Sequence, residues 1–177
     1  MQKLLAKLFL ITGAGFFIFA SYLFYERNFS NPLTFKAKPQ VIHYPGDQFP
    51  KTIQIPSINA TLPIVPSVIH GKSWETTSRG VSYLKTTPLP GTKGNSVIYG
   101  HNWKSILGNL PQVKPGQRII ITMNDGAKKE FKVEYTATVE PSQTYIIDNT
   151  KDSRVTIYTC TGFLDSKRFV VVALPVS

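Results

Sequence analysis

The 177-residue sequence predicts a mainly β protein, a barrel or a sandwich with little helix, preceded by one membrane-spanning helix. Short runs of β-branched and aromatic residues recur along the chain with turn-forming residues between them, which is the pattern of strands and turns. Only one segment of the remainder repeats its apolar residues with a helical period. Many short strands with little helix are typical of β-barrels and β-sandwiches.

The first element is an apolar run over residues 4–25, in which Lys7 is the only charged residue. Its length is about the 20 residues that a helix needs to cross a bilayer. Lys3 and Lys7 lie on its amino-terminal side, which predicts a cytoplasmic N-terminus and an extracytoplasmic remainder. A cleaved signal peptide is the alternative, but it would end in small residues, whereas this run ends in bulky aromatic ones. We therefore expect a cytoplasmic end and a single-pass anchor in residues 1–27.

Residues 28–50 are predicted to form an extended spacer, because they have no sustained hydrophobic period. His43 within the spacer is expected to be a solvated linker residue. The folded domain should then occupy residues 51–177, a length that suits one domain with a sizeable core. The prolines of the spacer are Pro32, Pro39, Pro45 and Pro50.

Several runs within this domain have the composition of strands. Asp125 and Gly126 between two of them predict a hairpin. Pro63 makes its own run either an edge strand or a bulge. The runs are 51–55, 61–65, 96–99, 118–123, 128–139, 155–159 and 168–174.

The helical period follows directly after the run 96–99 and predicts a short helix. Asn102 is in position to cap its start, Pro111 ends it, and Gly108 weakens it. The positive end of such a helix dipole would disfavour a protonated ring at His101. The periodic residues are Trp103, Ile106, Leu107 and Leu110.

The net charge of +10 favours negatively charged binding partners over positively charged ones. From residue 28 onward there are 17 basic and 9 acidic residues, a charge of about +8, and the lysines are scattered. Nucleic-acid binding favours a basic stripe with aromatic residues, which this pattern lacks. Attraction to anionic lipid and wall polymers, or simply a solvated basic surface, fits the pattern better.

The only cysteine, Cys160, follows the run 155–159 and lies where that strand ends. A lone cysteine excludes an internal disulfide. Alternation along the strand places Cys160 on the more polar face, with Tyr158. A buried thiol that acts as a small hydrophobic residue is the alternative. A thiol kept outside the cytoplasm is an oxidation hazard, however, which favours a function for it.

A thiol becomes a strong nucleophile beside a base or a cation. His101 is the best-placed base, because it follows a strand and a glycine at the same kind of position as Cys160. His70 is the alternative histidine. Arg168 begins the last strand and can stabilise the negative charge on an attacked carbonyl. The sequence therefore predicts a cleft at the rim of the sheet where Cys160, His101 and Arg168 meet.

Two of these stretches resemble motifs of the sortase family. Residues 156–160, Thr-Ile-Tyr-Thr-Cys, are followed by Arg168, and they are similar to the Thr-Leu-x-Thr-Cys strand that precedes the catalytic arginine of sortases. Residues 95–101 likewise resemble the strand that leads to the catalytic histidine. The resemblance covers about residues 53–173. Asn102 follows the histidine where many members have arginine or threonine, so the subgroup stays open.

The resemblance implies a closed β-barrel of about eight strands with short connecting helices. It also implies transpeptidation at a sorting signal of the Leu-Pro-x-Thr-Gly type. Cys160 would be the nucleophile, His101 the general acid and base, and Arg168 the residue that stabilises the oxyanion and orients the substrate. Tyr158 and Thr159 are expected to contact the substrate.

The implied partners are secreted proteins with a C-terminal sorting signal and an amine of a wall precursor or a pilin. No metal or other cofactor is expected in the chemical step, and a calcium site has only Glu140, Asp148 and Asp152 to draw on. Two alternatives remain. One is a membrane-tethered cysteine peptidase in which water resolves the acyl-enzyme. The other is a non-catalytic barrel that binds wall polymer with Cys160 buried. An L,D-transpeptidase is disfavoured, because its Ser-x-Gly-Cys context is missing.

Overall fold

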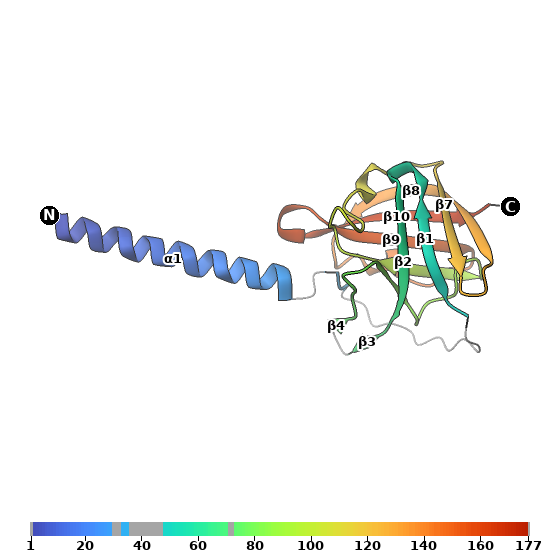
Figure 1. Ribbon diagram of the computed structural model, residues 1–177, viewed down its shortest axis with the longest axis horizontal. Coiled ribbons are helices and arrows are strands. Elements are labelled where there is room, and N and C mark those ends of the chain that lie inside the picture. Colours follow the sequence, from blue (N-terminus) through green and yellow to red (C-terminus); the bar gives the residue numbers. More distant parts are fainter. Residues whose placement is uncertain (1, 30–32, 36–47, 71–72, 177) are drawn as a thin grey trace. The chain divides into compact units, whose positions relative to one another are not determined.

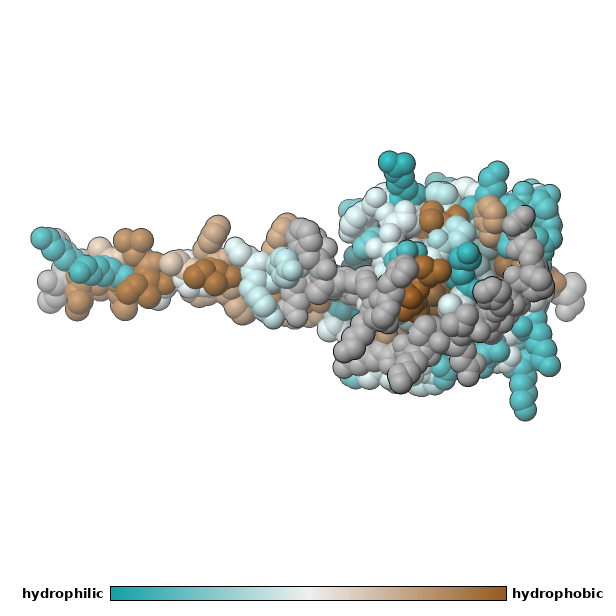
Figure 2. All heavy atoms as spheres, turned by 90° about the horizontal axis from the view of Figure 1, so that it is seen from below, coloured by the Kyte–Doolittle hydropathy of each residue, from teal (hydrophilic) through white to brown (hydrophobic). Residues whose placement is uncertain are grey.

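The computed structural model describes residues 2–29, 33–35, 48–70 and 73–176. The chain divides into two compact units, Met1–Pro32 and Leu33–Ser177. The first unit consists of the helix α1, Gln2–Phe29. Its segment Lys3–Tyr25 is long and apolar enough to cross a membrane, by length and composition. Figure 2 shows hydrophobic side chains along most of α1, so the helix is a candidate transmembrane span.

The second unit is a closed barrel of eight strands (Figure 1), which confirms the predicted fold class and excludes a sandwich. The strands neighbour one another in the order β1-β2-β5-β6-β9-β10-β8-β7. The pairs β2–β5 and β6–β9 are parallel, and the others are antiparallel. The barrel strands are β1 Pro50–Ile55, β2 Ala60–Ser67, β5 Val81–Leu84, β6 Gly94–Tyr99, β7 Arg118–Met123, β8 Lys128–Val139, β9 Ser153–Thr161 and β10 Lys167–Pro175.

Short elements connect the barrel strands. A separate two-stranded sheet pairs β3, Ile69–His70, with β4, Ser73–Trp74. Four of the other connections each contain a 3₁₀ turn, which are η1 Pro56–Ile58, η2 Leu110–Gln112, η3 Thr144–Ile147 and η4 Phe163–Asp165. The expected short connecting helices are therefore single 3₁₀ turns.

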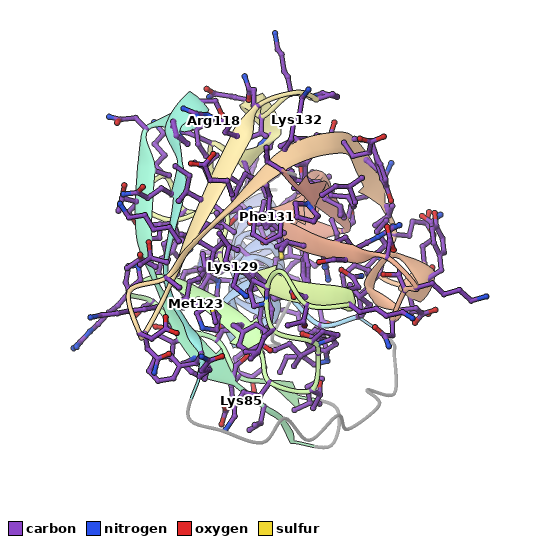
Figure 3. All side chains as sticks on the ribbon, turned by 90° about the vertical axis from the view of Figure 1, so that its right-hand side faces the viewer. Lys85, Arg118, Met123, Lys129, Phe131 and Lys132 are labelled. Carbon is purple, nitrogen blue, oxygen red and sulfur yellow. The ribbon has the colours of Figure 1, made fainter. Side chains whose placement is uncertain are left out.

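The barrel interior is filled by the apolar side chains of alternating positions. Phe131 of β8 is fully buried, and Figure 3 shows it toward the middle of the barrel, while Arg118 and Lys132 lie at the rim. Burying one such apolar side chain stabilises the fold by about 1.5–3 kcal/mol. Ile98, Ile157 and other inward residues of β6 and β9 belong to the same buried cluster. The inward-facing side chains of these strands therefore form the barrel core. The outward-facing side chains are not part of that core.

The hairpin predicted between β7 and β8 is confirmed. Gly126 has a φ of +87°, which a glycine adopts without strain, and its N–H donates to the carbonyl of Met123 at 3.1 Å. The prediction for Pro63 is wrong, because β2 lies inside a closed barrel without a register shift at that residue. β2 pairs with β1 up to Pro63 and with β5 from Ile64 on. A residue without an N–H therefore stands where the strand changes partner.

The predicted helix after β6 does not form. The N–H groups of Ile106 and Gly108 both donate to the carbonyl of Trp103, at 2.9 and 2.8 Å, and the N–H of Leu107 donates to that of His101. These bonds span three, five and six residues, so none is an α-helical bond. The apolar period nevertheless identified buried residues, since Ile106, Leu107 and Leu110 all lie in the barrel core.

Candidate active site

Two parallel strands deliver the predicted histidine and cysteine to one end of the barrel. Tyr99 of β6 pairs with Tyr158 of β9, and their rings stack with centroids 5.5 Å apart. His101 and Cys160 each follow these tyrosines by two residues. Parallel strands run in the same direction, so both residues lie at the carboxyl ends of neighbouring strands.

Two hydrogen bonds hold these strand ends together beyond the last ladder pair. The N–H of Gly100 donates to the carbonyl of Tyr158 at 3.2 Å. The hydroxyl of Thr159 donates to the carbonyl of Gly100 at 2.8 Å. The residue before His101 is therefore fixed to the residues before Cys160. Thr159, which was predicted to contact substrate, is fully buried and has this structural bond.

Arg168 of β10 lies directly opposite Cys160 in the antiparallel ladder. Its side chain is only 4% exposed, and one guanidinium nitrogen donates to the carbonyls of Asp165 and Lys167, both at 2.8 Å. Burial raises the pKa of the Cys160 thiol, and the nearby positive charge of Arg168 offsets only part of that rise. The structure thus brings two of the three predicted residues into register and places His101 at the same end of the barrel.

The thiol of Cys160 is more deeply buried than the sequence predicts. Its residue is 3% exposed, and burial raises its pKa to about 12, more than the charge of Arg168 lowers it. Cys160 and Tyr158 do lie on the same face of β9, as the alternation predicts. That face is not polar, however, because both residues belong to a second buried cluster outside the barrel core. The resting thiol is consequently protonated at neutral pH.

A short segment of the chain covers this outer face. Residues 33–35 fall in the range expected to be spacer, yet Leu33 and Phe35 are 0% and 2% exposed and join the cluster that contains Cys160. The Tyr158 hydroxyl donates to the carbonyl of Leu33 at 2.9 Å, and Arg168 donates to that of Thr34 at 3.3 Å. The ring of Phe35 meets Tyr158 edge to face at 4.9 Å. Nothing in the composition of residues 28–50 indicated this contact.

His101 is half-buried, and its ring stacks on the indole of Trp103 with centroids 4.5 Å apart and planes 10° from parallel. Burial lowers the pKa of His101, and the negative charge of Asp165 partly offsets this effect. The expected helix dipole does not act here, because the described residues 102–109 directly after His101 form turns and not a helix.

The loop between β9 and β10 supplies Asp165, which sequence reasoning did not assign to the site. Its carboxylate accepts a hydrogen bond from the Asn102 side chain at 2.8 Å, which ties this loop to the loop of His101. Leu164 and Asp165 both have left-handed φ values, 51° and 60°. Each such residue costs roughly 1 kcal/mol, so the surrounding contacts must hold the loop in place.

Asn95 holds the long connection between β8 and β9 beside the same face. Its side chain donates to the carbonyls of Ile146 and Asp148, both at 3.1 Å, and accepts a bond from Thr156 at 2.7 Å. Ile146 belongs to the cluster that contains Cys160. Over the described ranges, which leave out 30–32, 36–47 and 71–72, no group of three or more His, Cys, Asp or Glu side chains is close enough to hold a metal.

Neither of the other two histidines is placed at this site by the structure. His70 lies in β3, where its backbone pairs with Ser73. His43 lies outside the described residues.

Opening the cover should activate the thiol toward small reagents. In Phe35→Ala, loss of the ring that packs on Tyr158 should loosen residues 33–35 and expose Cys160 to water. The desolvation that raises the pKa is then reduced while Arg168 remains, so the pKa falls. A fall of one unit increases the thiolate fraction at pH 8 about tenfold. The measurement is the rate of iodoacetamide modification from pH 6 to 10.

Phe163→Ala is the matched control for Phe35→Ala. Phe163 is also an aromatic residue near Cys160 in sequence, but it is 85% exposed, so its loss should leave the alkylation rate unchanged. Equal alkylation rates in Phe35→Ala and the wild type would show that residues 33–35 do not control access to the thiol.

Comparison with known proteins supports one family for the barrel unit. The family model "Sortase domain" matches residues 53–176. Sortase A of Listeria monocytogenes serovar 1/2a is 30% identical over 134 residues, covering 73% of this chain and 58% of the relative. Sortase A of Bacillus anthracis is 27% identical over 123 residues, covering 67% of this chain and 56% of the relative. The chain therefore spans less than two thirds of the length of these curated relatives.

A solved structure shows the same architecture. A lid mutant of sortase A from Corynebacterium diphtheriae matches with a TM-score of 0.62 and 28% identity, covering 80% of this chain and 73% of that one.

Proposed function

Because the chain belongs to the sortase family, whose members are membrane-anchored cysteine transpeptidases, we propose that it joins secreted proteins to an amine acceptor. The strand register is the main support for this proposal. It sets Cys160 opposite Arg168 and brings His101 to the same end of the barrel. On this proposal the substrate carries a C-terminal sorting signal of the Leu-Pro-x-Thr-Gly type. The acceptor is an amine of a wall precursor or a pilin, and the apolar helix α1 anchors the enzyme with its N-terminus in the cytoplasm.

The reaction proceeds in two steps, formation of a thioester on Cys160 and transfer of its acyl group to the acceptor amine. The sulfur of Cys160 attacks the threonine carbonyl carbon of the signal, and the thiol proton passes to His101. The carbon–nitrogen bond to glycine breaks as His101 gives that proton to the leaving amine, which leaves a thioester on Cys160. The acceptor amine then attacks the thioester, His101 takes its proton, and the thiol leaves with that proton. One peptide bond is broken and one is formed.

Arg168 has a role in both steps. Each attack converts a carbonyl oxygen into an oxyanion, and a guanidinium in the same register position as the nucleophile is suited to stabilise it. Among the described residues, Arg168 donates to the carbonyl oxygens of Thr34, Asp165 and Lys167 in the resting state. One of these, that of Thr34, belongs to the covering segment. A substrate carbonyl that displaces residues 33–35 can take the place of this acceptor.

The test of the proposed function is product analysis by mass spectrometry. The full chain in detergent micelles is incubated with a panel of sorting peptides, with and without a glycine-based amine. The expected product is the peptide cut after threonine and joined to the added amine. A product in which water replaces the amine, even at high amine concentration, would identify a cysteine peptidase. No cleavage of any peptide would favour a non-catalytic barrel.

Arg168→Lys should reduce kcat/KM by roughly 10²-fold or more, because lysine keeps the charge but not the planar array of donors. The variant should remain folded, which circular dichroism can verify. Arg154→Lys is the matched control, since Arg154 lies at the opposite end of β9 and pairs with Asp152. Full activity in Arg168→Lys would remove Arg168 from the reaction.

A further inference from the structure

Trp103 is an aromatic residue at the candidate site to which the reaction above gives no role. Its side chain is 47% exposed, and its ring makes one specific contact at the site. That contact is with His101: the two rings are 4.5 Å apart between centroids and 10° from parallel. One face of the imidazole is therefore covered by indole.

The backbone of Trp103 is held independently of this ring contact. Its carbonyl accepts the N–H groups of Ile106 and Gly108 at 2.9 and 2.8 Å, and Ile106 is anchored in the barrel core. Gly108 permits this close turn, because a Cβ at that position would lie 2.8 Å from the carbonyl carbon of Trp103. The turn thus presents the indole as a fixed platform beside the end of β6.

The stacked pair favours one charge state of the histidine. The face of an indole is electron-rich and attracts a cation placed over it, whereas a neutral imidazole gains only the stacking contact. A general acid must carry the proton that it gives to the leaving amine. The ring contact therefore favours the protonated form of His101, which gives its proton to the leaving amine later in the acylation step.

Other ionisable groups at this end of the barrel come from several segments. They include Cys160 of β9, Asp165 of η4 and the exposed Lys104 on the loop of His101 itself. The strand register adds Lys167 and Arg168 of β10 and Glu140, which follows β8. Burial lowers the pKa of His101, and Asp165 raises it. The indole acts in the same direction as Asp165, against the effect of burial.

We propose that Trp103 is a positioning residue for His101, whose indole face fixes the imidazole for proton transfer and stabilises its protonated form. The predicted effect of Trp103 on turnover rests on the proposed function. The predicted effect of Trp103 on the pKa of His101 does not. Trp103 touches neither the scissile bond nor the thiol in this account and acts through His101 alone.

The experiment measures the pKa of His101 by NMR in the full chain, labelled at histidine and held in detergent micelles. His101→Gln assigns the resonance among the three histidines. In Trp103→Leu the pKa of His101 should fall by about 0.5, and Trp103→Phe should restore part of the difference. Phe163→Leu, which removes an exposed aromatic residue that does not stack on His101, is the matched control and should leave the pKa unchanged.

The pH profile of kcat/KM gives the second readout. The acidic limb in Trp103→Leu should move to lower pH by the same amount as the pKa, and the maximum should fall about threefold. A pKa of His101 that is unchanged in Trp103→Leu would overturn the proposal, as would a loss of activity that Trp103→Phe does not rescue. The NMR titration needs no substrate. A wild-type chain that processes no peptide would therefore count against the proposed function, and the titration would still decide the role of Trp103.

Discussion

Cys160→Ala should abolish transpeptidation, with a fall in kcat/KM of roughly 10⁴-fold or more, because no other thiol is present to form the thioester. The fold should remain, since removing one sulfur from a buried position costs about 1 kcal/mol. The measurement is peptide cleavage and amine transfer, with a thermal melt as the check on folding.

Cys160→Ser tests the same prediction with a smaller change in size than Cys160→Ala. The hydroxyl is a weaker nucleophile than a thiol, and the surrounding groups are suited to a sulfur, so this variant should also be inactive. Substantial peptide transfer by Cys160→Ala would mean that the buried thiol is a core residue and that the chemistry lies elsewhere.

His101→Ala should lower kcat/KM by about 10²–10⁴-fold, the usual range for a general acid and base. The loss should be present at every pH, and the acidic limb that reports the titration of His101 should disappear. His70→Ala is the matched control, because that residue lies in the separate β3–β4 sheet, and it should keep wild-type activity. An inactive His70→Ala beside an active His101→Ala would reverse the assignment of the base.

Much of the fold could be predicted from local sequence patterns. The strands β7 and β8 were predicted with their observed bounds, because alternation and the Asp-Gly turn between them are local signals. β5 was missed, since all four of its residues are buried and a fully buried strand shows no alternation. The turn after β6 was predicted as a helix, because buried turns can mimic a helical period when Gly108 lets the chain close more tightly.

The candidate site could be predicted only in part, for a physical reason. Cys160, His101 and Arg168 stand at strand ends, and strand ends are readable from composition. The burial of the thiol depends on residues 33–35, whose contact with Tyr158 joins positions more than 120 residues apart. The stacking of Trp103 on His101 depends on a turn that the sequence indicated wrongly. Contacts of this kind follow from tertiary structure and have no local signal.

Formation of a thioester between Cys160 and the sorting signal can be observed by intact-mass spectrometry of the enzyme. The enzyme is incubated briefly with a sorting peptide and no added amine, and the product is then mapped by peptide digestion at low pH. The predicted result is one adduct, equal in mass to the peptide acyl group ending in threonine, located on Cys160 and lost when a glycine-based amine is added. Turnover of the peptide without any adduct on Cys160, or with the adduct on another residue, would contradict the account.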